Sequence, residues 1–346
     1  MNKTRLKLFI WLLVAGDNTQ QRRVSSFHLF QQKKYMSLWK LKAIIQKTIS
    51  FLPYNHKVNY LFQKHITKGV HLTDELLEDK LLHCSHHLKA FEQFAMPKAQ
   101  LNEVVELGTG WFPIVPIGLY LIGAKHITTV DLTPLLRIDN VQTTLKKIVE
   151  YYENGKLQTF LPNIKKERWT TFCEIAKQAE NAQHCEAILE ALHITPLVAD
   201  ARNLPFKDAS IDFITSNNTF EHIYEPILLD ILREFRRISH AETLMSHFID
   251  MSDHFAHLDK KITIFNFLKF SEKQWQIIDN TIQPQNRLRI NKHRLLLEKT
   301  GFELLDEQNR IGNLSDLQSI NLADCFANFS TDDILVTHSL QICKSK

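Results

Sequence analysis

Short apolar segments alternate with segments of helical spacing over most of residues 101–346. Apolar runs of strand length that end in a carboxylate or a glycine turn are typical of strands buried on both faces of a parallel sheet. Apolar residues that recur every three or four positions predict amphipathic helices. The predicted strands cover residues 103–107, 127–131, a segment beginning at Leu197, 211–216, 243–249, 303–307 and 334–343, and the clearest helices cover 114–122, 226–238 and 292–300.

Two further regions show helical spacing. From Leu38 to about residue 100 the spacing predicts three or four helices that cap the remainder. Residues 139–192 are rich in Lys, Glu, Gln and Ala, and we expect helices there because a structureless loop of such length is uncommon. The alternation of strands and helices predicts an α/β protein. We divide the chain into a basic and apolar leader at 1–35, a helical cap at 36–100 and a main domain at 101–346 with insertions at about 139–192 and 250–290.

A glycine turn, Glu106-Leu107-Gly108-Thr109-Gly110, follows the first predicted strand and precedes a helix. Such a unit lets backbone N–H groups and a helix N-terminus approach a nucleotide-like ligand. A dinucleotide site has a small residue where Pro113 stands, and Glu106 would repel a pyrophosphate. The turn therefore favours a ligand that carries cationic groups over a nicotinamide dinucleotide.

Three motifs in chain order resemble those of the class I S-adenosylmethionine-dependent methyltransferases, with a core of methyltransferase type 11. They are Glu106–Gly110, Val130–Leu132, and Leu197–Phe206 continuing into 210–218 and 220–223. The resemblance covers roughly residues 101–240. It implies a Rossmann-like, doubly wound, mostly parallel seven-stranded sheet with an N-terminal helical cap and helical insertions.

The resemblance also implies S-adenosylmethionine as cofactor and gives each contact a role. Glu106 lies near the methionine amino group, Asp131 accepts the ribose hydroxyls, and Asp200 accepts from the adenine amino group. The glycines let the backbone pass close to the ligand. An alternative for Asp131 and Asp200 is that each only caps a turn or the next helix. The implied cofactor set is Glu106, Gly108, Thr109, Gly110, Asp131, Leu132, Asp200, Ala201 and Asn217.

A cluster of three His and three Asp follows the fifth predicted strand, between His247 and Asp259. It can supply a base with an orienting carboxylate, bind the acceptor, bind a metal or form a solvated loop. We choose His254 as the base, oriented by Asp253, with His222 as a second candidate, and we assign no metal. A guanidinium at Arg287 would suit an acidic acceptor. The predicted acceptor-binding residues are His247, Asp250, His257, Asp259 and Arg287.

The net charge of +4 hides an asymmetry, because residues 1–70 contain 13 Lys and Arg and one acid, Asp17. This basic arm suggests contact with an anionic membrane surface or a nucleic acid, or else a solvated extension without a partner. An apolar run at residues 8–15 follows three basic residues but is too short to span a bilayer. This run is either an interfacial anchor or part of a segment that precedes the true start of the protein at Met36.

Five cysteines without a C-x-x-C pair indicate a reducing compartment, so we expect a cytoplasmic protein, or alternatively one peripheral to the inner face of the membrane.

The predicted activity is methyl transfer from S-adenosylmethionine to an oxygen or nitrogen of a small-molecule, glycan or lipid-precursor acceptor. No Asn-Pro-Pro-Tyr or Asp-Pro-Pro-Tyr motif follows the fourth strand, and no Pro-Cys dipeptide occurs, so DNA bases are disfavoured. Two alternatives stay open: an RNA or protein methyltransferase that uses the basic arm, and a catalytically silent scaffold subunit. The sequence does not indicate an oligomeric state.

Overall fold

The computed structural model describes residues 37–51, 71–97 and 99–346. The predicted leader at 1–35 lies outside these residues, as do the parts of the cap and the basic arm between residues 52 and 70. The described residues, from Ser37 onward, all belong to one structural unit.

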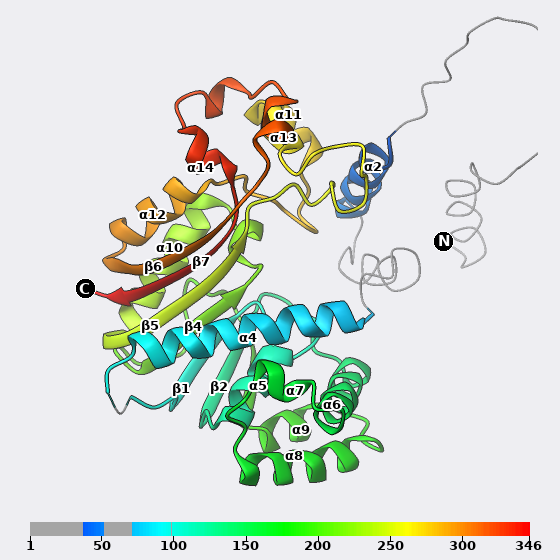
Figure 1. Ribbon diagram of the computed structural model, residues 1–346, viewed down its shortest axis with the longest axis vertical. Coiled ribbons are helices and arrows are strands. Elements are labelled where there is room, and N and C mark those ends of the chain that lie inside the picture. The colour runs from blue at the N-terminus through cyan, green and yellow to red at the C-terminus, as the bar shows by residue number, and fades with distance from the viewer. Residues whose placement is uncertain (1–36, 52–70, 98) are drawn as a thin grey trace, which may run out of the picture. The chain divides into compact units, whose positions relative to one another are not determined.

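The central sheet has seven strands in the order β3-β2-β1-β4-β5-β7-β6. Neighbouring strands from β3 to β5 are parallel, and β7 pairs antiparallel with both β5 and β6. The predicted mostly parallel, doubly wound sheet is thereby confirmed (Figure 1). The strands are β1 Glu103–Leu107, β2 His126–Asp131, β3 Ile194–Val198, β4 Ile211–Asn217, β5 Ser239–Asp250, β6 Phe302–Ile311 and β7 Val336–Ser345.

Helices cover both faces of this sheet because its central strands are apolar on both sides. On β1, Val104 and Val105 point to opposite faces and are both fully buried. Val104 belongs to the core beneath α4 (Asp74–Phe94) and α5 (Ile114–Ile122), and Val105 to the core beneath α10 (Glu225–Ile238) and α12 (Ile290–Lys299). The long helix α4 crosses β1, β4 and β5 (Figure 1). This one helix of the predicted cap therefore forms part of one layer of the domain.

Most of the remaining helices lie in the segments where sequence spacing predicts them. Residues 139–192 contain α6 to α9, as expected. The helices are α2 Leu38–Ser50, α4 Asp74–Phe94, α5 Ile114–Ile122, α6 Ile138–Glu153, α7 Leu157–Phe160, α8 Lys166–Ala179, α9 Glu186–Ala191, α10 Glu225–Ile238, α11 Glu272–Ile278, α12 Ile290–Lys299, α13 Leu314–Gln318 and α14 Thr331–Leu335, with short 3-10 turns at Phe220–His222, Asn266–Lys269 and Asp324–Phe326.

Several predicted boundaries are wrong, among them the start of the third strand, which is Ile194 and not Leu197. The segment 239–242, which separates the predicted helix at 226–238 from the predicted strand at 243–249, is a bulge inside β5. The pairing with β4 shifts there between Ile211 and Phe213, and the His240 N–H donates to Thr243 Oγ1. The last strand begins at Val336, whereas the sequence predicts a start at Ile334, a residue that lies in α14. A short helix and a buried strand can both present the same apolar run, so spacing could not separate them.

A third apolar cluster joins α2 to the segment that follows β5. Trp39 of α2 packs against Phe255, with 5.9 Å between ring centroids. Lys47 at the end of α2 donates to the carbonyls of Gln276 and Asp279 at 2.9 and 2.7 Å. These contacts hold α2 beside the strand ends of β4 and β5. None of the described helices is both long and apolar enough to cross a membrane.

Candidate functional site

The two glycines of the turn after β1 both have left-handed backbone torsions, with φ of 80° at Gly108 and 75° at Gly110. A Cβ at Gly108 would lie 2.2 Å from Oγ1 of Thr219, so a glycine at this position is needed for the close approach of the chain after β4, and its contact with the cofactor stays a prediction. A Cβ at Gly110 would have no atom within 4 Å. The open side of the turn is therefore at Gly110, where a ligand could approach the backbone.

Glu106 lies at the carboxyl end of β1 with only 2% of its surface exposed. Thr109 Oγ1 donates to its Oε2 at 2.5 Å. Burial raises the pKa of Glu106 to about 7, while the Thr109 hydroxyl and the positive charge of Lys80 on α4 act in the opposite direction. Lys80 is absent from the predicted site residues, because nothing in its helical spacing distinguishes it from other lysines of the cap.

Asp131 ends the adjacent strand β2 and faces the same turn. Its two oxygens lie 3.3 and 3.4 Å from the Gly110 N–H, which donates to them. Burial raises the pKa of Asp131 to about 7, and the neighbouring charge of Glu106 contributes to the increase. Two neighbouring carboxylates that ionise with difficulty favour a ligand with positive groups. S-adenosylmethionine, with its sulfonium and ammonium groups, fits this requirement.

A polar chain from the cap reaches Glu106 and was missed by the sequence analysis. His87 of α4 is fully buried, with Nδ1 2.7 Å from Ser246 Oγ and Nε2 2.9 Å from Asn217 Oδ1. When His87 Nε2–H donates to Asn217 Oδ1, the Nδ2 of the same Asn217 amide points toward Glu106. The Asn217 amide lowers the pKa of Glu106. Nδ2 still has no hydrogen-bond partner within normal geometry among the described residues. The only signal in the sequence was the presence of His83, His86 and His87 on one amphipathic helix.

The predicted adenine contacts follow β2 and β3. Asp200 forms an ion pair with Arg202 at 2.5 Å and accepts from the Arg202 N–H at 3.0 Å, which is a turn-capping geometry. The alternative interpretation of Asp200 as a turn residue therefore describes its present contacts. Leu132 is 75% exposed, while Ala201 is buried. Their roles toward adenine remain predictions.

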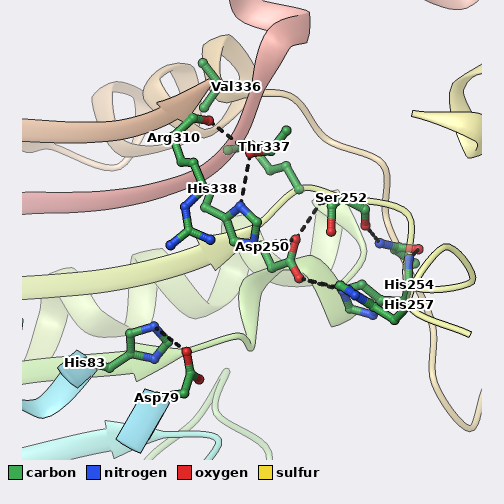
Figure 2. Close-up of polar contacts among 12 residues, drawn as sticks. Asp79, His83, Asp250, Ser252, His254, His257, Arg310, Val336, Thr337 and His338 are labelled. Carbon is green, nitrogen blue, oxygen red and sulfur yellow. Dashed lines mark hydrogen bonds and ion pairs between the residues drawn. The ribbon is translucent and has the colours of Figure 1, made fainter. Parts of the chain in front are cut away.

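On the acceptor side, Asp250 at the end of β5 is surrounded by imidazoles. Its Oδ2 lies 3.3 Å from His254 Nε2 and 3.8 Å from His257 Nε2, and its Oδ1 lies 3.4 Å from His338 Nε2. Figure 2 shows His254 and His257 on one side of the carboxylate and His338 on the other. These contacts hold the pKa of Asp250 far below its usual range against the effect of burial. The charged Asp250 is thus placed to stabilise a protonated imidazole.

This arrangement corrects the expected role of Asp253. Its oxygens accept from the Phe255 N–H at 2.8 Å and from Asn266 Nδ2 at 3.1 Å, and the residue is fully buried. Asp253 therefore stabilises the loop to which it belongs, and the carboxylate beside His254 is that of Asp250.

Three of the predicted acceptor-binding residues likewise make hydrogen bonds within the protein. Asp259 accepts from the Trp39 N–H at 3.3 Å. His247 is fully buried in β5, bonded to Ser216 Oγ at 2.8 Å, and burial lowers its pKa to about 3. Arg287 is buried and donates to two backbone carbonyls and to Glu272. None of the three can be assigned to the acceptor, because their polar groups are hydrogen-bonded inside the protein or enclosed by it.

His222 lies in the turn after β4 and close to His254, with 5.1 Å between ring centroids. Its Nδ1 donates to the Pro284 carbonyl at 2.7 Å, and burial lowers its pKa to about 4. A neutral imidazole held in this tautomer keeps a lone pair on Nε2. The structure thus brings His222, from the turn after β4, together with Asp250, His254 and His257, which lie close to one another in the segment at and after the end of β5.

A carboxylate with a raised pKa affects stability in a defined pH window. Between the unfolded value of about 4.5 and the folded value of about 7, native Glu106 binds more protons than the unfolded chain, so its contribution to stability falls as the pH rises. We expect Glu106→Gln to gain stability over the wild type across this window, by about 3 kcal/mol at most. Thermal unfolding of both proteins in ligand-free buffers from pH 4 to 8 measures the difference. A constant difference across the window, or an equal trend in the exposed control Glu174→Gln, would contradict the assignment.

Comparison with known proteins gives a match to the family model described as a methyltransferase domain over residues 164–244. The match begins before α8 and ends within β5, so it includes β3, β4 and α10 but not the glycine turn. No curated protein is significantly similar in sequence to the chain.

Solved structures with a similar fold include several methyltransferases. One is a proposed sarcosine dimethylglycine methyltransferase of Galdieria sulphuraria, 15% identical with a TM-score of 0.42, covering 83% of this chain and 97% of that one. Another is an S-adenosylmethionine-dependent methyltransferase of Methanosarcina mazei, 12% identical with a TM-score of 0.41, covering 74% and 96%. These TM-scores are too low to carry an inference about the acceptor. The match over residues 164–244 identifies a methyltransferase domain in this chain, for which S-adenosylmethionine is the implied cofactor, and the strand order and the turn after β1 agree with the fold that the motifs predict.

Proposed function

We propose that the protein transfers the methyl group of S-adenosylmethionine to an oxygen or nitrogen of a small-molecule, glycan or lipid-precursor acceptor. The observation that carries this proposal is the placement of two distinct sets of groups beyond the carboxyl ends of the parallel strands. Glu106, Asp131 and Asp250 lie at the carboxyl ends of β1, β2 and β5, and His222 lies in the turn after β4. Ligands of open α/β sheets bind at this edge.

The first set fits the cofactor. Asp131 would accept from the ribose hydroxyls, and Glu106, with the Asn217 amide beside it, would face the methionine amino group. Bound S-adenosylmethionine supplies an activated methyl group. The protein's part is to hold the donor and acceptor in line, and such positioning accounts for much of the rate of a displacement reaction.

The second set fits an acceptor of limited size. A small pocket beside His254 is lined by Lys42 and Gln46 of α2, Trp275 of α11 and Gln285. Polar groups from the cap and from the segment after β5 therefore converge beside one histidine. His254 beside Asp250 is placed to assist the loss of a proton from the acceptor.

Cofactor binding is tested by Asp131→Ala. The change removes hydrogen bonds to a carboxylate, each worth about 1.5–3 kcal/mol, so calorimetry should show at least a roughly tenfold loss of affinity for S-adenosylmethionine. Asp332→Ala, at an exposed position in α14, is the control and should bind as the wild type does. Wild-type affinity in the Asp131 variant would refute the ribose assignment.

Acceptor activation is tested by His254→Ala. Removal of an acid–base group is expected to lower turnover about 10²–10⁴-fold. Cofactor affinity should stay within about twofold because its contacts lie on other strands. Release of S-adenosylhomocysteine with a panel of phenolic, sugar and amine acceptors measures turnover, and exposed His184→Ala provides the control. Normal turnover in the His254 variant would exclude this histidine from the reaction.

A further inference from the structure

Glu221, in the 3-10 turn after β4, is an unexplained buried acid. Only 2% of its surface is exposed, and neither carboxylate oxygen has a hydrogen-bond partner among the described residues. The backbone N–H groups of Glu221 and Asp250 face the carboxylate without reaching normal hydrogen-bond geometry. A buried carboxylate without partners is costly, and such groups in native proteins call for an explanation.

Two imidazoles lie beside this carboxylate. Glu221, His222 and His254 each offer one ligand atom, and these atoms all lie within 4.8 Å of one another. The Nδ1–H of His222 is engaged with the Pro284 carbonyl, which fixes the ring and leaves Nε2 free. Metal-binding histidines are typically oriented in this way by a hydrogen bond from the other ring nitrogen.

A second set overlaps the first and contains Asp250, His254 and His257, whose ligand atoms also lie within 4.8 Å of one another. The two sets share His254. Asp250 therefore adds a second carboxylate next to Glu221, whose pKa it raises. The His257 side chain is 59% exposed, so the group is reached from solvent on this side.

A single proton or hydrogen bond could satisfy only one of these groups. A divalent cation would satisfy the orphan carboxylate and both imidazole lone pairs at once, and would offset two neighbouring negative charges. Two imidazoles with a carboxylate are typical ligands of zinc and related transition metals, whereas magnesium and calcium prefer oxygen ligands.

We propose that Glu221, His222 and His254 bind a divalent transition-metal ion of the zinc type, with Asp250 and His257 beside the site as outer-shell groups that do not ligate the ion. Three protein ligands leave a coordination position open, as in catalytic zinc sites. On the basis of the function proposed above, that position would take an oxygen or nitrogen of the acceptor and lower its pKa, and His254 would then promote proton loss as a ligand of the ion and not as a free base. The acceptor class is then a molecule with an ionisable hydroxyl or a coordinating nitrogen.

Metal binding by the tag-free, full-length protein tests the proposal. After treatment with a chelator and dialysis, calorimetric titration with ZnCl₂ should show one equivalent bound, and CoCl₂ should give visible absorption bands of nitrogen- and oxygen-ligated cobalt. Glu221→Gln should weaken zinc binding at least about tenfold, since even outer-shell partners contribute that much to metal affinity. His254→Ala should do the same, and His184→Ala should bind zinc as the wild type does.

Two results would overturn the site: no stoichiometric zinc binding by the wild type, or unchanged binding in both Glu221→Gln and His254→Ala. If Glu221→Gln does not fold, His254→Ala decides, because His254 lies in a loop and not in the sheet. Titration of the same samples with S-adenosylmethionine separates the two proposals. Cofactor binding and turnover without zinc binding overturn the metal site alone, while zinc binding with no cofactor binding counts against methyl transfer and leaves the site intact.

Discussion

The site depends on two carboxylates that the fold holds close together without a full counter-charge. Leu107 and Val130 are register partners in the parallel pair β1 and β2, so the residues at the ends of these strands face one another. Glu106 and Asp131 consequently share a buried environment in which each pKa lies at about 7. Burial of these two carboxylates lowers the stability of the ligand-free protein. A cationic cofactor bound beside them would offset their charge, so the same burial strengthens cofactor binding.

The acceptor side follows from the same strand geometry. Asn217 and Phe248 are register partners of β4 and β5, Glu221 lies in the turn after β4, and Asp250 is the last residue of β5. A buried polar chain links both sides, since Ser246 of β5 contacts His87, and His87 in turn holds the Asn217 amide beside Glu106. The cap helix α4 thus forms part of the site through His87 and Lys80.

The sequence predicted the sheet well because buried parallel strands are apolar runs that end in recognisable residues. It also located the turn at Gly110 and the cluster around His254. It could not assign individual roles, because residue type does not reveal partners. Arg287 resembles an anion-binding guanidinium but donates to backbone carbonyls, and His247 resembles a ligand but lies in the core. Asp250 lies beside His254 while Asp253, its sequence neighbour, closes the loop.

Proton release on cofactor binding tests the central claim most directly. Calorimetry of S-adenosylmethionine binding near pH 6.5, in buffers of different ionisation enthalpy, reports the protons exchanged. Because a cationic ligand favours ionised carboxylates, the wild type should release up to about one proton and bind more tightly as the pH rises toward 7, and Glu106→Gln should release fewer protons. Equal proton exchange in the wild type and the variant, with affinity independent of pH between about 5.5 and 7.5, would contradict the account.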